Sequence, residues 1–186
     1  MPLLTAEASW YPDGLFHDEN LAPPTGHLWW ALHVRPRQEK SLARELLGKQ
    51  LAFYLPLVSR RWRSQGRPMT SHLPLFAGYL FLRCTRDGRL GALATNRVVR
   101  CLDVAQQDLL WRDLRQIHRL IGAGAPLTPE SKLTPGTPVE IASGPLMGLR
   151  GKVLRTASGR RFIVEVDFIR RGASVMLDDH VLTRLD

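Results

Sequence analysis

A chain of 186 residues with 44% hydrophobic residues is long enough for one medium-sized domain or two small ones, and its apolar content is that of an ordinary folded protein. No apolar run approaches the roughly 20 residues that span a bilayer, and the N-terminus lacks the basic start and apolar core of a signal peptide, so we expect a cytoplasmic protein without a membrane contact. The net charge of +9 is concentrated in residues 29–119, which hold 17 basic and 6 acidic residues, and this excess favours a polyanion such as nucleic acid as partner.

The cysteines and histidines give no sign of a metal centre or of catalysis. Cys84 and Cys101 are far apart and have no neighbours at metal-ligand spacing, and the six histidines are scattered. We therefore predict free thiols in a reducing compartment, no metal and no cofactor. Neither cysteine lies in a nucleophile motif, and Cys84 ends an apolar run in which a buried thiol is common. We expect no enzyme.

Residues 1–28 differ from the rest of the chain in charge and composition. They contain four acids and no Lys or Arg, and they are rich in Pro, Asp, Gly and Asn. This predicts a flexible acidic extension. Local docking of Trp10 and Phe16 is an open alternative.

Residues 29–121 alternate between two kinds of pattern. Aromatic and apolar runs predict strands over 29–34, 53–64, 78–84 and 97–104, with residues 66–68 in the loop of a hairpin. Helical spacing predicts helices over 38–50, 87–96 and 106–122. On the last of these, the residues expected on one apolar face are Leu109, Leu110, Leu114, Ile117 and Ile121. The order of elements favours an α+β domain with helices on one face of an antiparallel sheet.

The remainder of the chain reads as a linker and a small β domain. Residues 122–135 contain three prolines and no periodicity, which is typical of a linker. Residues 136–186 predict five short strands in a small barrel. Within them, the segment "IASGPLMGLRGKVLR" (141–155) contains Gly144, Gly148 and Gly151, which suit positive φ or a close approach of backbones and would bend the ribbon. An ordinary hairpin with a Gly-rich loop remains the alternative.

Two groups of motifs resemble a known family. The segment "PGTPVEIASGPLMGLRGKVLR" looks like a KOW motif, and "WWALHVRPRQEKSLARELL", "LPLFAGYLFLR" and "TNRVVRCLD" resemble the amino-terminal domain of the NusG family of transcription factors. Ala77 stands where the family's core phrase has proline. The resemblance covers about residues 29–186, and the basic hairpin with Arg61, Arg63 and Arg67 suggests a specialised, RfaH-like paralogue.

The resemblance implies a fold and a layout. We expect a NusG-type α+β domain at 29–121, an SH3-like β-barrel (KOW) at 136–186, the linker 122–135 between them, and the extension 1–28 ahead of them. It also implies an elongation and antitermination factor that is a monomer and not an enzyme. The first domain would bind the clamp helices of RNA polymerase and approach the non-template DNA strand. The KOW domain would recruit a ribosomal protein or the Rho factor.

Three sets of residues follow from matching this chain to the family's motifs. The polymerase-binding set comprises Leu75, Phe76, Tyr79 and Phe81, with core packing as the alternative. The nucleic-acid set comprises Arg35, Arg37, Gln38, Lys40 and Arg44, with a solvated helix face as the alternative. The KOW partner set comprises Leu146, Met147 and Leu149, with some packing into the barrel as the alternative. A ribosome-associated or RNA-binding KOW protein is the rival interpretation, because it would share the barrel and the positive charge.

Overall fold

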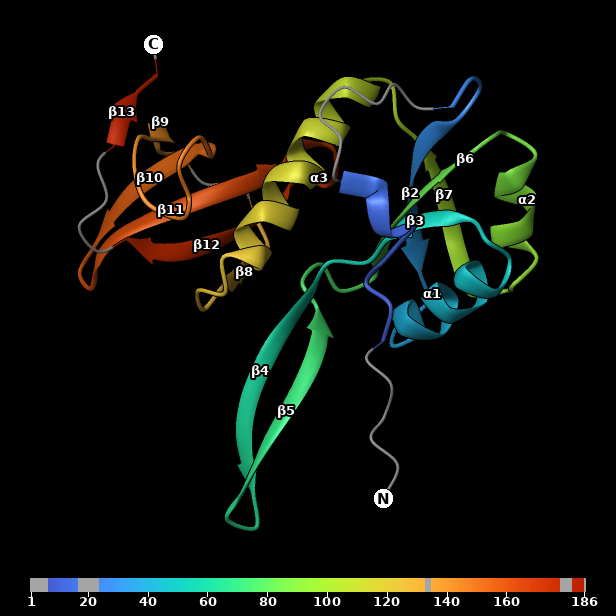
Figure 1. Ribbon diagram of the computed structural model, residues 1–186, viewed down its shortest axis with the longest axis horizontal. Coiled ribbons are helices and arrows are strands. Elements are labelled where there is room, and N and C mark those ends of the chain that lie inside the picture. The colour runs from blue at the N-terminus through green and yellow to red at the C-terminus, as the bar shows by residue number, and fades with distance from the viewer. Residues whose placement is uncertain (1–6, 17–23, 133–134, 178–181, 186) are drawn as a thin grey trace. The chain divides into compact units, whose positions relative to one another are not determined.

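The computed structural model describes residues 7–16, 24–132, 135–177 and 182–185. Contacts divide the chain into two compact units, residues 1–107 and 108–186. Antiparallel strands dominate both units and helices are few (Figure 1), which confirms the predicted α+β class. Within the described ranges, no helix combines the length and the apolar character that crossing a membrane requires.

A five-stranded antiparallel sheet is the frame of the first unit. Its strand order is β1-β3-β6-β2-β7. The bounds are β1 (Trp10–Tyr11), β2 (Leu28–Val34), β3 (Ala52–Tyr54), β6 (Tyr79–Cys84) and β7 (Val98–Asp103). β2 and β6 pair along most of their length, from Leu28 opposite Cys84 to His33 opposite Tyr79. The strands predicted at 29–34, 78–84 and 97–104 are therefore confirmed to within a residue at each end.

Helices α1 (Glu39–Gly48) and α2 (Gly88–Leu93) contribute to the core on one face of this sheet. Successive side chains of a strand point to opposite faces, so β2 and β6 each send every second residue toward the helices. The main members of this core are Trp30, Leu32, Val34, Leu42, Ala43, Leu46, Phe53, Leu55, Leu80, Leu82 and Ala92. By the same alternation, Tyr79 and Phe81 belong to the opposite face.

Part of the N-terminal extension is folded onto the sheet, so its predicted flexibility is wrong for these residues. β1 pairs Trp10 with Tyr54 and Tyr11 with Phe53, and the 3-10 turn η1 (Asp13–Phe16) follows. Phe16 is buried, and its ring centroid lies 4.7 Å from that of Tyr54 in an edge-on arrangement. Packing of Phe16 on Tyr54 and the strand pairing of Trp10 and Tyr11 order this segment despite its content of Pro, Asp and Gly. Residues 1–6 and 17–23 of the expected extension lie outside the described residues.

Strands β4 (Leu57–Ser64) and β5 (Arg67–Pro74) form a separate two-stranded ribbon that projects from the rest of the first unit (Figure 1). The single strand predicted at 53–64 is thus two strands, β3 and β4. The hairpin turn is shorter than expected, because Arg67 already pairs with Ser64. Gln65 and Gly66 have φ values of 49° and 78°, as the two central residues of a type I′ turn require.

A six-stranded antiparallel sheet forms most of the second unit, in the order β13-β9-β10-β11-β12-β8. The bounds are β8 (Thr128–Glu130), β9 (Thr137–Ile141), β10 (Arg150–Thr156), β11 (Gly159–Val166), β12 (Arg171–Leu177) and β13 (Leu182–Arg184), with the 3-10 turn η2 (Asp167–Ile169) before β12. Each of the five predicted strands has a counterpart, although residues 178–181 of the last two lie outside the described ranges.

β8 lies inside the segment predicted to be a linker. It pairs with β12, with Glu130 opposite Gly172. Glu130 accepts a hydrogen bond of 2.6 Å from the Ser174 hydroxyl and an ion pair of 3.3 Å from Arg161. The prolines around this strand hid it, because proline is depleted in strands and tolerated only at positions such as this sheet edge.

The glycines of the turn between β9 and β10 serve both of the purposes expected of them. Gly144 and Gly148 have φ values of 85° and 79°, and the Gly148 amide donates to the Ile141 carbonyl at 2.7 Å. Gly151 instead permits close approach, because a Cβ atom there would lie 2.2 Å from the carbonyl oxygen of Ile163. The turn therefore needs Gly144 and Gly148 for its backbone conformation, and the close approach of β10 to β11 needs Gly151.

Helix α3 (Gln107–Gly122) makes polar contacts with loops and strands of the second unit. The Asp113 carboxylate accepts from the Asp167 amide at 3.1 Å, and the Gln116 side chain accepts from the Arg150 amide at 2.6 Å. Contacts thus group α3 with the second unit, whereas the sequence prediction counted this helix in the domain at 29–121. Periodicity placed the helix correctly but carries no information on which of its polar residues find backbone partners.

The apolar face of α3 is rotated slightly from the predicted one. Leu110, Leu114 and Ile117 are buried as expected, and the fourth buried apolar residue is Leu120. Leu109 and Ile121 are only partly buried.

Asp113→Asn should stabilise the second unit at neutral pH. Burial raises the pKa of the Asp113 carboxyl to about 6 despite the hydrogen bond from Asp167, whereas an unfolded chain has a value of about 3.9. The folded state therefore holds this proton more tightly, and the parent loses stability as the pH rises from about 4 to about 6. Asparagine cannot ionise and keeps an acceptor oxygen. The gain in melting temperature should be fully developed at pH 7–8 and shrink toward pH 4, and a pH-independent difference would contradict this account.

Candidate docking and nucleic-acid surfaces

Residues 76–79 form a tight turn that leads into β6. The Tyr79 amide donates to the Phe76 carbonyl at 3.0 Å, and Gly78 has a φ of 81°. A positive φ at the third position is the requirement of a type II turn, and proline is favoured at the second. The exposed Ala77 occupies that second position, so the turn keeps its glycine geometry without the proline.

A buried carboxylate fastens this turn to α1. Glu39 is 6% exposed, and its Oε1 atom accepts from the Gly78 amide at 2.7 Å. It is the first residue of α1, where the free amides and the helix dipole favour a negative charge. This role of Glu39 was not predicted from the sequence. An acid in the first helical turn was the available signal, but its partner lies 39 residues away.

The predicted polymerase-binding residues lie close together on the sheet face opposite α1, and most are buried. Leu75, Phe76 and Phe81 are almost inaccessible, and the rings of Phe76 and Phe81 meet edge-on at 6.5 Å. Tyr79 is partly exposed, and its ring lies 5.5 Å from the ring of the exposed His33. Of the four predicted residues, Tyr79 is the one that offers its side chain to the surface.

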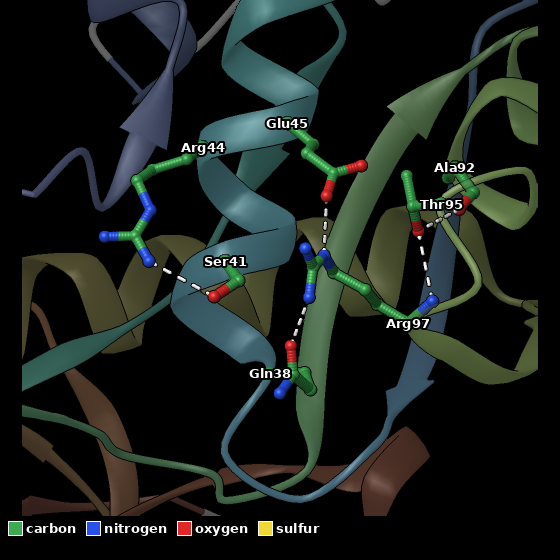
Figure 2. A network of polar contacts seen from close by, with 7 residues as sticks. All are labelled: Gln38, Ser41, Arg44, Glu45, Ala92, Thr95 and Arg97. Carbon is green, nitrogen blue, oxygen red and sulfur yellow. Dashed lines mark hydrogen bonds and ion pairs between the residues drawn. The ribbon is translucent and has the colours of Figure 1, made fainter.

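Arg97 joins the start of α1 to the segment before β7, as Figure 2 shows. Its Nε atom donates to Glu45 at 2.6 Å and its Nη1 atom donates to the Gln38 side chain. The Thr95 hydroxyl donates to the Ala92 carbonyl at 2.7 Å and accepts from the Arg97 amide at 3.3 Å. The side chain of Gln38, predicted to contact nucleic acid, is therefore engaged within the protein. Sequence patterns do not reveal this role of Arg97, because Glu45 and Gln38 are 52 and 59 residues away.

Two other members of the predicted nucleic-acid set are paired with the N-terminal segment. Lys40 lies 3.2 Å from one carboxylate oxygen of Glu7, and Arg44 lies 3.3 Å from the other. Arg44 also donates to the Ser41 hydroxyl at 3.1 Å (Figure 2). The acidic segment thus partly neutralises the outer face of α1.

Arg35 and Arg37 are the exposed members of the set without a side-chain partner among the described residues. They flank Pro36 in a turn in which the Gln38 amide donates to the Arg35 carbonyl at 3.0 Å. Arg37 has a φ of 62°, a conformation that few residues other than glycine and asparagine adopt readily. A long cation at such a position is uncommon and is held out into solvent.

The predicted KOW partner set divides in the structure. Leu146 and Leu149 are buried, whereas Met147 is 59% exposed at the tip of the turn. The Met147 carbonyl accepts from the Arg119 guanidinium at 2.5 Å. The structure therefore leaves one apolar side chain of this turn available to a partner.

The cysteine thiols lack the character of nucleophiles. Burial raises the pKa of Cys84 to about 12, and it raises the pKa of Cys101 in the same direction. A reactive cysteine needs the opposite shift, because the thiolate is the nucleophile. Within the described residues, no cluster of His, Cys, Asp and Glu is arranged to hold a metal ion.

Comparison with known proteins agrees with the motifs of the first unit. Residues 27–132 match the family described as "NusG: Transcription termination factor nusG". The match spans more than half of the chain and includes the turn at 76–79 together with α1, α2 and α3. No curated protein is similar enough to count as a match.

Proposed function

The chain belongs to the NusG family of transcription elongation and termination factors, and on this premise we propose that it binds RNA polymerase through its first unit and favours processive elongation. The observation that carries the proposal is the family match over residues 27–132. We propose further that it is a specialised, RfaH-like paralogue that acts as a monomer. No chemical step is involved, because the factor would bind one conformational state of the polymerase more tightly and so raise its population.

The polymerase would dock at the sheet face opposite α1, with Tyr79 at the surface and Leu75, Phe76 and Phe81 beneath it. The buried aromatic rings give Tyr79 a rigid support, and a supported tyrosine loses little side-chain entropy on binding. The expected partner is the pair of clamp helices, since apolar and aromatic surfaces of this kind accept helical faces.

Nucleic acid would approach the start of α1. Arg35 and Arg37 supply cations without internal partners, and Lys40 and Arg44 become available if Glu7 releases them. Residues 136–186 of the second unit would act as the KOW domain, with Met147 contacting a ribosomal protein or the Rho factor.

Transcription by purified core polymerase on a template with a terminator tests the proposal. Full-length protein should raise the fraction of transcripts that pass the terminator, and immobilised protein should retain core polymerase from a purified preparation. Retention of ribosomes without polymerase would overturn the proposal in favour of the ribosome-associated interpretation. Absence of any effect on elongation or termination would overturn it as well.

Glu7→Gln should raise the affinity of the full-length protein for single-stranded DNA. The substitution removes the carboxylate that lies within 3.3 Å of both Lys40 and Arg44, and it keeps a side chain of the same size. Each cation freed to contact a phosphate should steepen the slope of log K against log salt by about 0.7. Glu140→Gln, which removes an ion pair to Arg150 in the second unit, is the matched control. An unchanged slope for Glu7→Gln would show that the acidic segment does not compete with DNA.

A further inference from the structure

The β4–β5 ribbon carries positive charge without any acid to balance it. Residues 57–74 contain four arginines and neither Asp nor Glu. The four are Arg60, Arg61, Arg63 and Arg67. All are exposed, and none has an ion-pair partner among the described residues. A projecting element with this charge attracts polyanions from every side.

Strand register sorts these arginines onto two different faces. Arg60 pairs with Ser71, Trp62 with Met69, and Ser64 with Arg67. Directly paired residues point to the same side of a ribbon, as do residues two apart on one strand. Arg60, Trp62, Met69 and Arg67 therefore share one face, which we call the tryptophan face.

The other face has the same number of arginines but no Trp, Tyr or Phe. It presents Arg61 opposite Thr70 and Arg63 opposite Pro68. The two faces thus differ in their apolar residues and not in the number of their arginines.

The tryptophan face exposes two large apolar side chains to solvent. Trp62 is 47% exposed and Met69 is 45% exposed, at facing positions of the ribbon. The ribbon is a sheet of its own, so among the described strands none other than β5 hydrogen-bonds beside Trp62. Neighbouring exposed large apolar residues on one element are typical of an interaction surface.

We propose that the tryptophan face binds single-stranded nucleic acid, with a base stacked on Trp62 and phosphates held by Arg60 and Arg67. An exposed aromatic ring among cations is the combination that proteins use for single strands, because every base has a face to stack and every nucleotide a phosphate. Arg60 lies about 7 Å from Trp62 along β4, and Arg67 approaches the same ring from the facing strand. The absence of acids from the ribbon favours a polyanion as its ligand. The proposal needs no polymerase and goes beyond the function proposed above.

Binding of a fluorescent 12-nucleotide single-stranded DNA to the full-length protein tests this site. The parent and every variant in this experiment should also carry Arg35→Gln and Arg37→Gln, so that the start of α1 contributes little to the measured DNA affinity. Trp62→Ala should weaken binding roughly 5- to 150-fold, since truncation of the ring that stacks on a base costs that much in affinity. Trp62→Phe should retain most of the affinity because it keeps an aromatic ring. Circular dichroism should be unchanged, because Trp62 lies outside the buried core.

The arginines provide a comparison at equal charge. Arg60→Gln/Arg67→Gln should reduce the steepness of the salt dependence by about 1.4, corresponding to two phosphate contacts on a single strand. Arg61→Gln/Arg63→Gln removes the same charge from the opposite face and should have a clearly smaller effect. Equal losses for the two pairs, with no effect of Trp62→Ala, would overturn the proposal in favour of unspecific attraction.

A second arm separates the single strand from a duplex. Tighter binding of a duplex of the same sequence would overturn the proposal, because a two-stranded ribbon also fits the major groove. Because no polymerase is present, binding that depends on Trp62 supports this site even if the protein has no effect on transcription. Conversely, DNA binding that does not depend on Trp62 would overturn this site without bearing on the proposed polymerase contact.

Discussion

Tyr79→Ala should weaken the binding of the full-length protein to RNA polymerase about thirtyfold. Truncation of an aromatic hot spot typically costs ~2 kcal/mol or more, which corresponds to this factor. Tyr79 is the partly exposed member of a set whose other members are buried, so its loss removes contact area at the surface and leaves the core rings in place. Affinity measured by biolayer interferometry with purified core polymerase gives the result directly.

Two controls make the Tyr79 experiment decisive. Leu90→Ala removes an exposed apolar side chain from α2, away from the proposed docking face, and should leave the affinity unchanged. Circular dichroism and the melting temperature must show that the Tyr79→Ala variant keeps its first unit folded. A folded variant that binds as tightly as the parent would refute the docking surface. A parent that does not bind polymerase would refute the proposed function as a whole.

Gly151→Ala should destabilise the second unit by about 3 kcal/mol or more, the upper end of the cost of overpacking. The new Cβ would lie 2.2 Å from the Ile163 carbonyl oxygen and 2.9 Å from the Phe162 ring. The Phe162 ring could rotate away from the new Cβ atom. The Ile163 carbonyl belongs to the backbone of β11, so β10 and β11 would have to move apart. Urea denaturation of the full-length protein should show an early transition for this variant.

Two other glycines supply matched comparisons for Gly151. Gly148→Ala meets only the Arg119 guanidinium at 3.9 Å, so its cost comes from the positive φ of 79° and should be about 1–2 kcal/mol. Gly122→Ala, at the end of α3, meets nothing within 4 Å and should be close to neutral. Equal destabilisation by Gly151→Ala and Gly148→Ala would show that the strands can adjust to the added atom.

The regular elements followed from sequence patterns because their causes are local. The alternation and apolar content of β2 and β6, and the leucine spacing of α1, predicted each element within about a residue of its observed start. Gly122 was correctly expected to end α3. The need for glycine in the turn after β9 could also be predicted, since φ is a property of single residues.

Features that depend on distant partners could not be predicted in this way. The pairing of Glu7 with Lys40 and Arg44 joins an acidic segment to a helix more than 30 residues away. The hydrogen bond from the Gly78 amide to Glu39 likewise joins residues that are far apart in the sequence. Single-sequence patterns contain propensity and periodicity, and neither records which distant polar groups meet. β8 was missed for a related reason, because its strand character arises from the neighbouring edge of β12 and not from its own residues.

The predicted site residues show the limit of assigning surface roles from alternation. Alternation placed Tyr79 and Phe81 on the same face, but it did not reveal that Phe81 is buried and Tyr79 is partly exposed. Gln38 and Met147 are similar cases. Their positions followed from the motifs, whereas the engagement of the Gln38 side chain by Arg97 and the exposure of Met147 depend on tertiary neighbours.

The short strand β1 also closes an edge of the first sheet. β3 pairs with β6 on one side and with β1 on the other, so Ala52–Tyr54 is an inner strand. The family segment begins at residue 27, and a shortened protein that began there would lack β1. In that shortened protein, the backbone amides and carbonyls on one side of the apolar strand β3 would be unpaired, and they could pair with a strand of a second molecule. By covering this edge, β1 should reduce self-association of the first unit, and versions of the chain without β1 should aggregate more readily than the full-length chain.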